Sequence, residues 1–273
     1  PELTDFKVQP NEDDPFYPTF TWSTGSEDLW YGFLIQDDKS IEHQYHSAVA
    51  HIPLNETGTA TYLYRYDGSY AGSIASRVTA TNVGKTTSIE GLAGNCLEFD
   101  GSTLRYSLFA DGSYTEPSAE MSIVAHFAAS AADDTHYIVS KYQQFGVYVD
   151  SGGYINAKVF YSGANSVDLK SISLVPTDGK TPVNVIVTLD TGLPNGNVKL
   201  FINGKLEDQS GVKTTDGSTS NWKINTTLPD TAEPLVIGMT DTDDGGIPDD
   251  HHFEGTIEEI VIYNKAIFPV VPQ

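Results

Sequence analysis

The sequence predicts an all-β protein, built as an antiparallel sandwich, jelly roll or barrel. Short runs rich in β-branched and aromatic residues recur along the 273 residues, and turn residues separate them. Convincing amphipathic helices are absent, and so is any repeat of about 20–50 residues. A βαβ fold, a solenoid and a propeller are therefore not expected.

The expected strands follow one another along most of the chain. They are PTFTW (18–22), LWYGFLIQ (29–36), SIVAHFAA (122–129), YIVSKY (137–142), FGVYVD (145–150), YINAKVFY (154–161), VNVIVTLD (183–190), NVKLFING (197–204), LVIGM (235–239) and TIEEIVIYN (256–264). DSGGY (150–154) supplies a turn, and INGK (202–205) supplies the Asn-Gly pair that a type I′ hairpin needs at its two positive-φ positions. Neighbouring strands are therefore expected to pair as antiparallel hairpins.

The charge of the chain restricts its partners. There are 37 acidic and 15 basic residues, giving a net charge of −22. Phosphates would be repelled, so nucleic acids and anionic membrane surfaces are not expected partners. No apolar run is long enough for membrane insertion. The acidity is typical of a surface that stays soluble outside a cell, at a cell surface or on a virion.

Cys96 is the sole cysteine, which excludes an intrachain disulfide and a cysteine-based metal site. We expect it to be a small buried thiol. The first residues, PELTDFKVQP, contain neither a Met nor an apolar signal core, so we expect a processed or excised piece of a longer chain.

The first 58 residues differ in composition from the rest of the chain. They contain Trp22 and Trp30, a Pro-rich segment and a His-bearing segment. This length is short for an immunoglobulin-like or fibronectin-like sandwich. We expect residues 1–58 to be either a partial domain of that kind or extra strands docked on a main domain of residues 59–273.

Five segments from about Ala60 onward are similar to motifs of one jelly-roll family, in the same order. GLAGNCLEFDGS (91–102) is similar to a G-x-A-L-x-F-D-G-S strand and turn, and EMSIVAHFAA (120–129) to an F-T-V-S-A-W-V strand. Two hairpins follow at 137–159 and 183–211, and HFEGTIEEIVIYNKAI (252–267) is similar to a closing strand. The chain thus resembles the concanavalin A-like jelly rolls of the laminin-G-like and pentraxin-like families over roughly residues 60–268.

The resemblance implies an antiparallel two-sheet jelly-roll sandwich in which residues 253–264 form a central strand. Alternation then predicts burial either of Phe253, Ile257, Val261 and Tyr263 or of Ile260 and Ile262. The sequence departs from the family motifs at two places, and both concern the site and not the fold. Pro182-Val183-Asn184 replaces the usual Trp-His, and Glu258 stands where Asp is commoner.

Relatives of this kind often bind a structural Ca²⁺, and by position Asp100 and Glu258 match residues that tie the first and last strands through such an ion. A second candidate is the loop DTDDGGIPDDHH (241–252), which offers Asp241, Asp243 and Asp244 as hard oxygen ligands. This loop is not an EF-hand, because His252 stands where the twelfth-position Glu would be required. The alternative is that these carboxylates are solvated or cap turns.

Catalysis by the closing strand is not expected. Glucanases of this fold carry an E-x-D-x-E or E-x-D-x-x-E strand, and Glu254, Thr256 and Glu258 reproduce the alternation without the central Asp. Alternation would also direct Glu259 to the opposite face from Glu258. No other catalytic motif is found. We therefore expect that the protein is not an enzyme, with a β-glucanase-like hydrolase as a minor alternative.

The expected function is a non-catalytic extracellular binding or adhesion module for a glycan or a surface protein. Exposed aromatic rings suit sugars, and Tyr66, Tyr70 and Trp222 are the candidate contacts, with Tyr62 and Tyr64 nearby. Alternating Tyr residues also serve cross-strand packing. The competing hypothesis is a structural or display protein of an extracellular assembly, such as a virion decoration, a fibre or a surface layer, with homo-oligomers expected.

Overall fold

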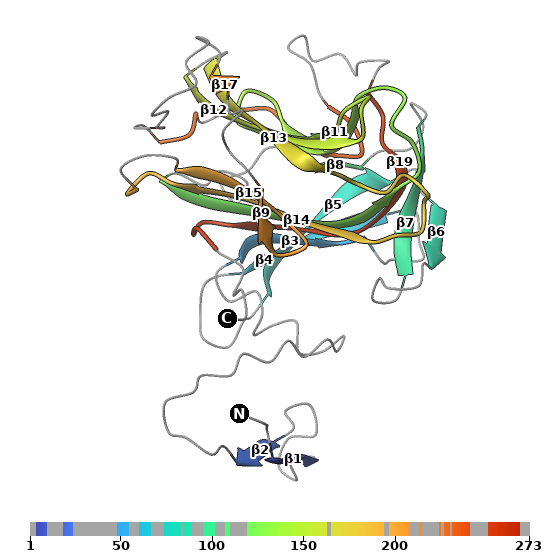
Figure 1. Ribbon diagram of the computed structural model, residues 1–273, viewed down its shortest axis with the longest axis vertical. Coiled ribbons are helices and arrows are strands. Elements are labelled where there is room, and N and C mark those ends of the chain that lie inside the picture. The colour runs from blue at the N-terminus through green and yellow to red at the C-terminus, as the bar shows by residue number, and fades with distance from the viewer. Residues whose placement is uncertain are drawn as a thin grey trace.

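In the computed structural model, every regular element among the described residues is a β-strand (Figure 1). The structure describes residues 4–9, 19–23, 48–54, 60–66, 74–82, 85–88, 95–101, 107–109, 119–162, 165–193, 197–207, 213–214, 224, 227–229, 231–240 and 251–267. Nothing helical in these ranges has the length and apolar character needed to cross a membrane. The predicted all-β class is confirmed.

The strands, in chain order, are β1 Thr4–Gln9, β2 Thr19–Ser23, β3 Ala48–Pro53, β4 Ala60–Tyr66, β5 Ile74–Asn82, β6 Lys85–Ser88, β7 Asn95–Asp100, β8 Ser107–Phe109, β9 Glu120–Ala129, β10 His136–Lys141, β11 Phe145–Val149, β12 Tyr154–Ser162, β13 Asn165–Leu174, β14 Val183–Asp190, β15 Val198–Ile202, β16 Lys205–Leu206, β17 Lys213–Thr214, β18 Leu235–Ile237 and β19 Glu254–Tyr263.

These strands pair antiparallel and form two packed layers. The first layer runs β16, β15, β14, β9, β19, β3, β4 and β5, with β7 and β6 beside the first half of β19. The second layer runs β17, β13, β12, β11, β10, β18 and β8. Figure 1 shows the layers stacked, and pairing of β8 with the end of β5 joins them along one edge. The predicted antiparallel two-sheet sandwich is confirmed.

The N-terminal strands divide between two places. β1 and β2 form a two-stranded sheet of their own. β3 pairs with β19 instead, and Ala50, Ile52 and Leu54 are buried in the main core. Part of the segment 1–58 therefore supplies a strand to the sandwich, while a domain boundary at residue 58 stays a prediction. The strand expected at 29–36 lies outside the described residues.

The core lies between the layers and is made of the inward residues of both. Phe253 is fully buried, and its ring makes edge contacts with Phe99 at 6.0 Å and with Phe127 at 5.8 Å between centroids. These three rings come from segments far apart in the sequence. Their packing therefore depends on β7, β9 and β19 lying side by side, as the strand register requires. Cys96 is buried as expected.

The predicted hairpin turns are present. Asn203 and Gly204 have φ of 49° and 77°, so the Asn-Gly pair occupies the two positive-φ positions of the β15–β16 turn. At the β11–β12 turn, Gly153 has φ of 79° and its N–H donates to the carbonyl of Asp150. Turn chemistry thus sets both hairpin connections.

β19 contains a β-bulge at Glu258. Ile257 pairs with Phe127 and Glu259 pairs with His126, so β19 has one more residue than β9 at this point. The burial expected from strict alternation is therefore wrong, because the extra residue shifts the phase of the strand. Residues from both alternating sets enter the main core, namely Phe253, Ile257, Ile260 and Ile262, while Val261 and Tyr263 belong to a smaller cluster with Ala48.

Truncation of the Phe253 side chain should destabilise the protein strongly. We expect Phe253→Ala to lower the free energy of unfolding by about 3–5 kcal/mol, because transfer and cavity terms add in a close-packed core. Leu174→Ala is the control, since Leu174 is 61% exposed, and it should change stability by less than about 0.5 kcal/mol. Urea unfolding followed by tryptophan fluorescence measures both, and equal effects would contradict this account of the core.

Candidate functional site

The aromatic residues selected from the sequence cannot be placed in a site. Tyr66 ends β4, but its side chain lies outside the described part of the structure, and so do Tyr70 and Trp222. Their role in ligand binding stays a prediction. The described residues offer two other groupings of polar and aromatic side chains, one on the outer face of each layer.

The register of the closing strand separates Asp100 from Glu258. Asp100 lies opposite Glu254 in the β7–β19 ladder, and Glu258 is four residues further along, about 13 Å at the rise of a strand. Glu258 instead lies beside His126, at 3.9 Å between Oε2 and Nδ1. Asp100 and Glu258 are thus not brought together, and the described residues contain no group of three or more His, Cys, Asp or Glu able to hold a metal ion.

Asp241, Asp243 and Asp244 lie outside the described residues. Calcium binding by their loop stays a prediction. If Ca²⁺ binds there in the native state alone, a hundredfold excess over Kd should stabilise the protein by roughly 2.7 kcal/mol. Melting in EDTA and then in excess Ca²⁺ measures this, and the double variant Asp243→Asn/Asp244→Asn should remove the effect. An unchanged midpoint in the wild type would reject calcium as a structural ligand.

The bulge places Glu258 and Glu259 together on the outer face of the first layer, whereas alternation predicts opposite faces. Nδ1 of His126 on β9 lies 3.0 Å from Oε1 of Glu259, and Nε2 of His51 on β3 lies 3.2 Å from Oε2 of the same carboxylate. The side chain of Asn184 on β14 contacts Nε2 of His126. Four strands therefore meet at one His–Glu cluster.

In this cluster, hydrogen bonds and charge pairs together shift the pKa values of His126 and Glu259 more than burial does in the opposite direction. Burial disfavours the protonated form of His126, yet the hydrogen bond to Glu259 and the charges of Glu259 and Glu258 raise its pKa above the ordinary 6.5. Burial likewise disfavours ionised Glu259, but hydrogen bonds from His126 and His51 hold its pKa well below the ordinary 4.5. The cluster is thus a stabilising ionic contact between β9, β19 and β3.

These two shifts predict a pH window of greatest stability. A raised His126 pKa stabilises the fold below pH 6.5, and this contribution is lost as the pH rises through the folded-state pKa. A lowered Glu259 pKa stabilises above pH 4.5 and is lost as the pH falls. Both contributions are therefore present together between pH 4.5 and 6.5.

The measurement is the difference in unfolding free energy between wild type and His126→Gln from pH 5 to pH 8. We expect the advantage of the wild type to shrink across this range. His251→Gln is the control, because the His251 side chain is 39% exposed and the carboxylate beside it is Asp134, at 3.8 Å. A constant difference for His126→Gln would show that its protonation does not contribute.

The second grouping lies on the outer face of β10 to β13, which we call the β10–β13 face. Its described side chains are Tyr137, Tyr148, Tyr154, Asn156, Lys158, Phe160, Asp168 and Lys170, with Asp150 at the rim. Tyr137 lies opposite Tyr148, Tyr148 opposite Asn156, and Asn156 opposite Lys170. Inward neighbours such as Val147, Ala157 and Leu169 are core residues, so these outward side chains form one row across four strands.

The two tyrosine rings form a tilted pair. Their centroids are 4.7 Å apart with an interplanar angle of 33°. The Tyr137 ring also lies against the backbone of Gly146, where a Cβ atom would meet its Cε1 at 2.9 Å. Both tyrosines are partly exposed. They thus offer an aromatic surface held against the sheet.

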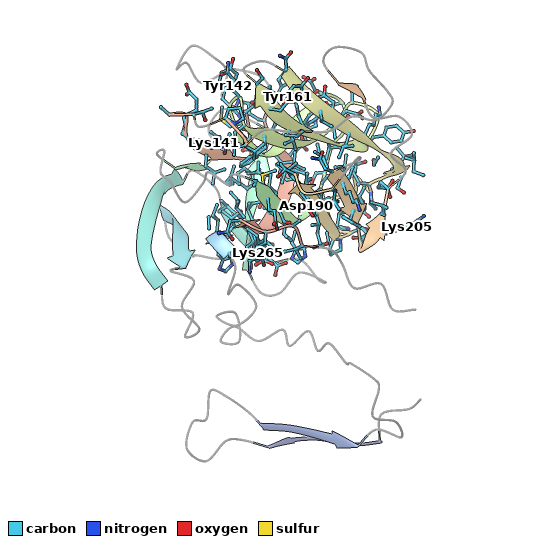
Figure 2. The ribbon with its side chains drawn as sticks, turned by 90° about the vertical axis from the view of Figure 1, so that its left-hand side faces the viewer. Lys141, Tyr142, Tyr161, Asp190, Lys205 and Lys265 are labelled. Atoms are coloured by element: carbon cyan, nitrogen blue, oxygen red, sulfur yellow. The ribbon has the colours of Figure 1, made fainter. Side chains whose placement is uncertain are left out.

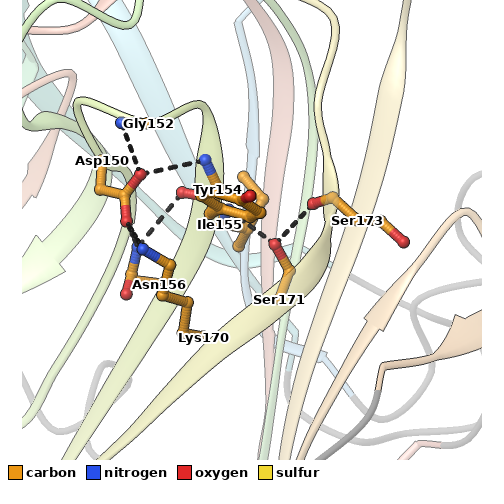
Figure 3. Close-up of polar contacts among 8 residues, drawn as sticks. All are labelled: Asp150, Gly152, Tyr154, Ile155, Asn156, Lys170, Ser171 and Ser173. Carbon is orange, nitrogen blue, oxygen red and sulfur yellow. Dashed lines mark hydrogen bonds and ion pairs between the residues drawn. The ribbon is translucent and has the colours of Figure 1, made fainter. Parts of the chain in front are cut away.

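Asp150 organises the rim of this face (Figure 3). Its Oδ1 accepts hydrogen bonds from the N–H groups of Gly152 at 2.9 Å and Tyr154 at 3.1 Å. Its Oδ2 accepts from Nδ2 of Asn156 at 3.0 Å and from Nζ of Lys170 at 2.6 Å. Nζ of Lys170 also lies 4.4 Å from the centroid of the Tyr154 ring. The turn, the amide and the lysine are therefore fixed by one carboxylate.

The phenols of Tyr137 and Tyr148 stay protonated at neutral pH. Burial, and then the negative charge of Asp168, raises the pKa of Tyr137 to about 12. Burial also raises the pKa of Tyr148, with further contributions from Tyr137, Asp168 and Asp150. The strand register places Asp168 on this same face, opposite Lys158. Phenol donors, carboxylate acceptors and an amide are thus gathered beside two rings.

Sequence reasoning missed this face because a second bulge creates it. The turn after β10 puts Lys141 opposite Phe145 and Val139 opposite Val147, but a register shift then puts Tyr137 opposite Tyr148. Ile138 and Val139 both enter the core. Without this shift Tyr137 would point inward. The alternation YINAKVFY, with its outward Tyr, Asn, Lys and Phe, was the available signal.

The sequence matches the family model described as the concanavalin A-like lectin/glucanases superfamily, of the laminin G type, over residues 100–269. This is more than half of the chain. The chain therefore belongs to this superfamily, and the resemblance noted from its motifs is confirmed. No curated protein matched the sequence in the corresponding comparison.

Solved structures share the fold at low sequence identity. The binding domain of Paraclostridial Mosquitocidal Protein 1 aligns with a TM-score of 0.55 and 10% identity, over 81% of this chain and 49% of that one. Domain 4 of AbnA, a GH43 extracellular arabinanase from Geobacillus stearothermophilus in complex with arabinotriose, aligns with a TM-score of 0.50 and 16% identity, over 82% and 95%. This chain spans about half the length of the mosquitocidal domain, and these similarities describe the fold alone.

Proposed function

We propose that this chain is a non-catalytic carbohydrate-binding module that takes its ligand on the β10–β13 face. The observation that carries the proposal is the Tyr137–Tyr148 ring pair, flanked by Asp168 and the Asp150–Asn156–Lys170 group. Aromatic faces contact the C–H groups of a sugar, and neighbouring carboxylates and amides bind its hydroxyls. The face has both kinds of group on rigid, core-packed strands.

The fold is compatible with this use. The superfamily description names lectins and glucanases, and domain 4 of AbnA was solved with arabinotriose. The proposal for this chain nevertheless rests on its own residues, since a shared fold does not define function. The acidic composition further supports a location outside the cell, at a cell or virion surface.

The non-catalytic part of the proposal rests on the carboxylates. On β19, Thr256 stands between Glu254 and Glu258, and Glu258 and Glu259 lie at the His–Glu cluster. On the β10–β13 face, Asp150 already accepts four hydrogen bonds, including one from Lys170. A glycosidase needs one protonated and one ionised carboxyl facing the same glycosidic bond. Neither face offers that arrangement among the described residues.

The test is saccharide binding by a ring-truncation series. We expect the wild type to bind at least one glycan on a printed array, and isothermal titration with that glycan should show Tyr148→Ala weakened about tenfold, roughly 1.4 kcal/mol, since a stacking surface is lost. Gly146→Ala should also weaken binding, because the added Cβ displaces the Tyr137 ring.

Tyr142→Ala is the matched control and should keep the wild-type affinity. Tyr142 belongs to the β10–β11 turn, at the opposite end of the same hairpin from Tyr137, and Figure 2 labels it beside Lys141. Binding that survives Tyr148→Ala would place the ligand elsewhere. Regular oligomers without any glycan binding would instead support the structural or display role in an extracellular assembly.

A further inference from the structure

The strands that form the β10–β13 face contain no arginine. The three arginines of the chain are Arg65, Arg77 and Arg105, whereas β10 to β13 span residues 136–174. Arginine is the side chain that best recognises an ionised carboxylate, because its planar guanidinium donates two parallel hydrogen bonds. Within these four strands, the cationic side chains that a carboxylated sugar could meet are therefore lysines.

The lysines of these strands are already engaged. Lys141 is fully buried and donates to the carbonyls of Thr231 at 3.0 Å and Glu233 at 2.6 Å. Lys170 forms an ion pair with Asp150 at 2.6 Å. Lys158 lies opposite Asp168 in the β12–β13 ladder, with its Nζ 5.4 Å from the centroid of the Phe160 ring. Lys141 and Lys170 are thus bound to oxygen atoms of the protein, and Lys158 lies over an aromatic ring.

Carboxylates stand beside the outward lysines of this face. Asp150 pairs with Lys170, and Asp168 lies opposite Lys158 of β12 and Lys213 of β17. Asp134 lies 3.8 Å from His251, whose ring is 6.3 Å from that of Tyr137. The negative charge of Asp168 also acts on both tyrosine hydroxyls. An ionised sugar placed on the ring pair would meet these carboxylates at short range, with loss of hydration. Sugar hydroxyls, in contrast, can donate to the same oxygens.

We infer that the β10–β13 face selects neutral, hydroxyl-rich saccharides and discriminates against saccharides that carry a carboxylate, such as a terminal sialic acid. This inference rests on the proposed carbohydrate-binding function. The discriminating groups are Asp150 and Asp168. Their oxygens can accept hydrogen bonds from sugar hydroxyls, and Asp150 pairs with Lys170, which would otherwise attract an anion.

The experiment compares matched glycans that differ by one acidic sugar. A printed array with lactose and 3′-sialyllactose, and with further neutral glycans paired with their sialylated or uronic acid forms, is probed with the intact chain at low salt. We expect binding to neutral members and at least tenfold weaker binding to their acidic partners. Preferential binding to acidic members would overturn the inference and leave the binding function intact. Binding to no glycan would overturn the proposed function itself.

Charge variants then identify the cause. Asp150→Asn removes the negative partner of Lys170, so the ratio of acidic to neutral binding should rise several-fold. Asp168→Asn should act in the same direction without altering the turn. Asp190→Asn is the matched control, because Asp190 accepts from the N–H of Gly192 at 2.8 Å as Asp150 does from Gly152, but on β14 of the other layer.

The control should leave the ratio unchanged, and thermal melting establishes that each variant is folded. Unchanged ratios in both folded face variants would show that these carboxylates do not set the selectivity, and this would overturn the inference. A rise in the ratio that disappears at high salt supports it, because exposed charge interactions are screened there.

Discussion

The pairing of β19 with β9 is the contact on which the rest of the sandwich depends. β19 lies against β9 along its whole length on one side, and on the other it meets β7 first and β3 afterwards. Segments from the first fifth, the middle and the end of the chain are thereby joined in one ladder. Phe253 packs against Phe99 and Phe127 because of this arrangement. Because β19 pairs with three strands, its register must fit all three of them. The extra residue at Glu258 adjusts that register.

The His–Glu cluster and the β10–β13 face, both built from described residues, each arise at a β-bulge. At Glu258 the extra residue puts two carboxylates on one face, where they meet His126 and His51. At Ile138 the register shift turns Tyr137 outward, where it meets Tyr148. At the first bulge two consecutive polar residues, Glu258 and Glu259, interrupt the alternation. At the second, two consecutive core residues, Ile138 and Val139, do so. A bulge costs ladder hydrogen bonds, and here each one changes which side chains share the outer surface.

Much of the fold follows from local sequence, because β-branched runs and turn residues act over a few positions. The strands at 122–129, 145–150 and 183–190 and the Asn203-Gly204 turn are of this kind, and the structure contains them. The bulges are different, since their cause is the fit between strands distant in sequence. Strict alternation therefore misplaced Glu259 and mixed the two predicted burial sets of β19. It also could not pair Tyr137 with Tyr148, because a hairpin register counted from the turn would direct Tyr137 inward.

The two layers differ in what their outer polar groups do. On β19, the carboxylates of Glu258 and Glu259 pair with histidines of neighbouring strands. This mostly buried charge pairing stabilises the sheet. On β10 to β13, Asp150 binds a turn and Lys170 while the rings beside it stay partly exposed. A buried ion pair gains little by accepting a ligand, since its charges are already satisfied. A partly exposed ring gains by covering its apolar face. Of these two groupings, the His–Glu cluster is therefore better suited to a structural role and the β10–β13 face to recognition.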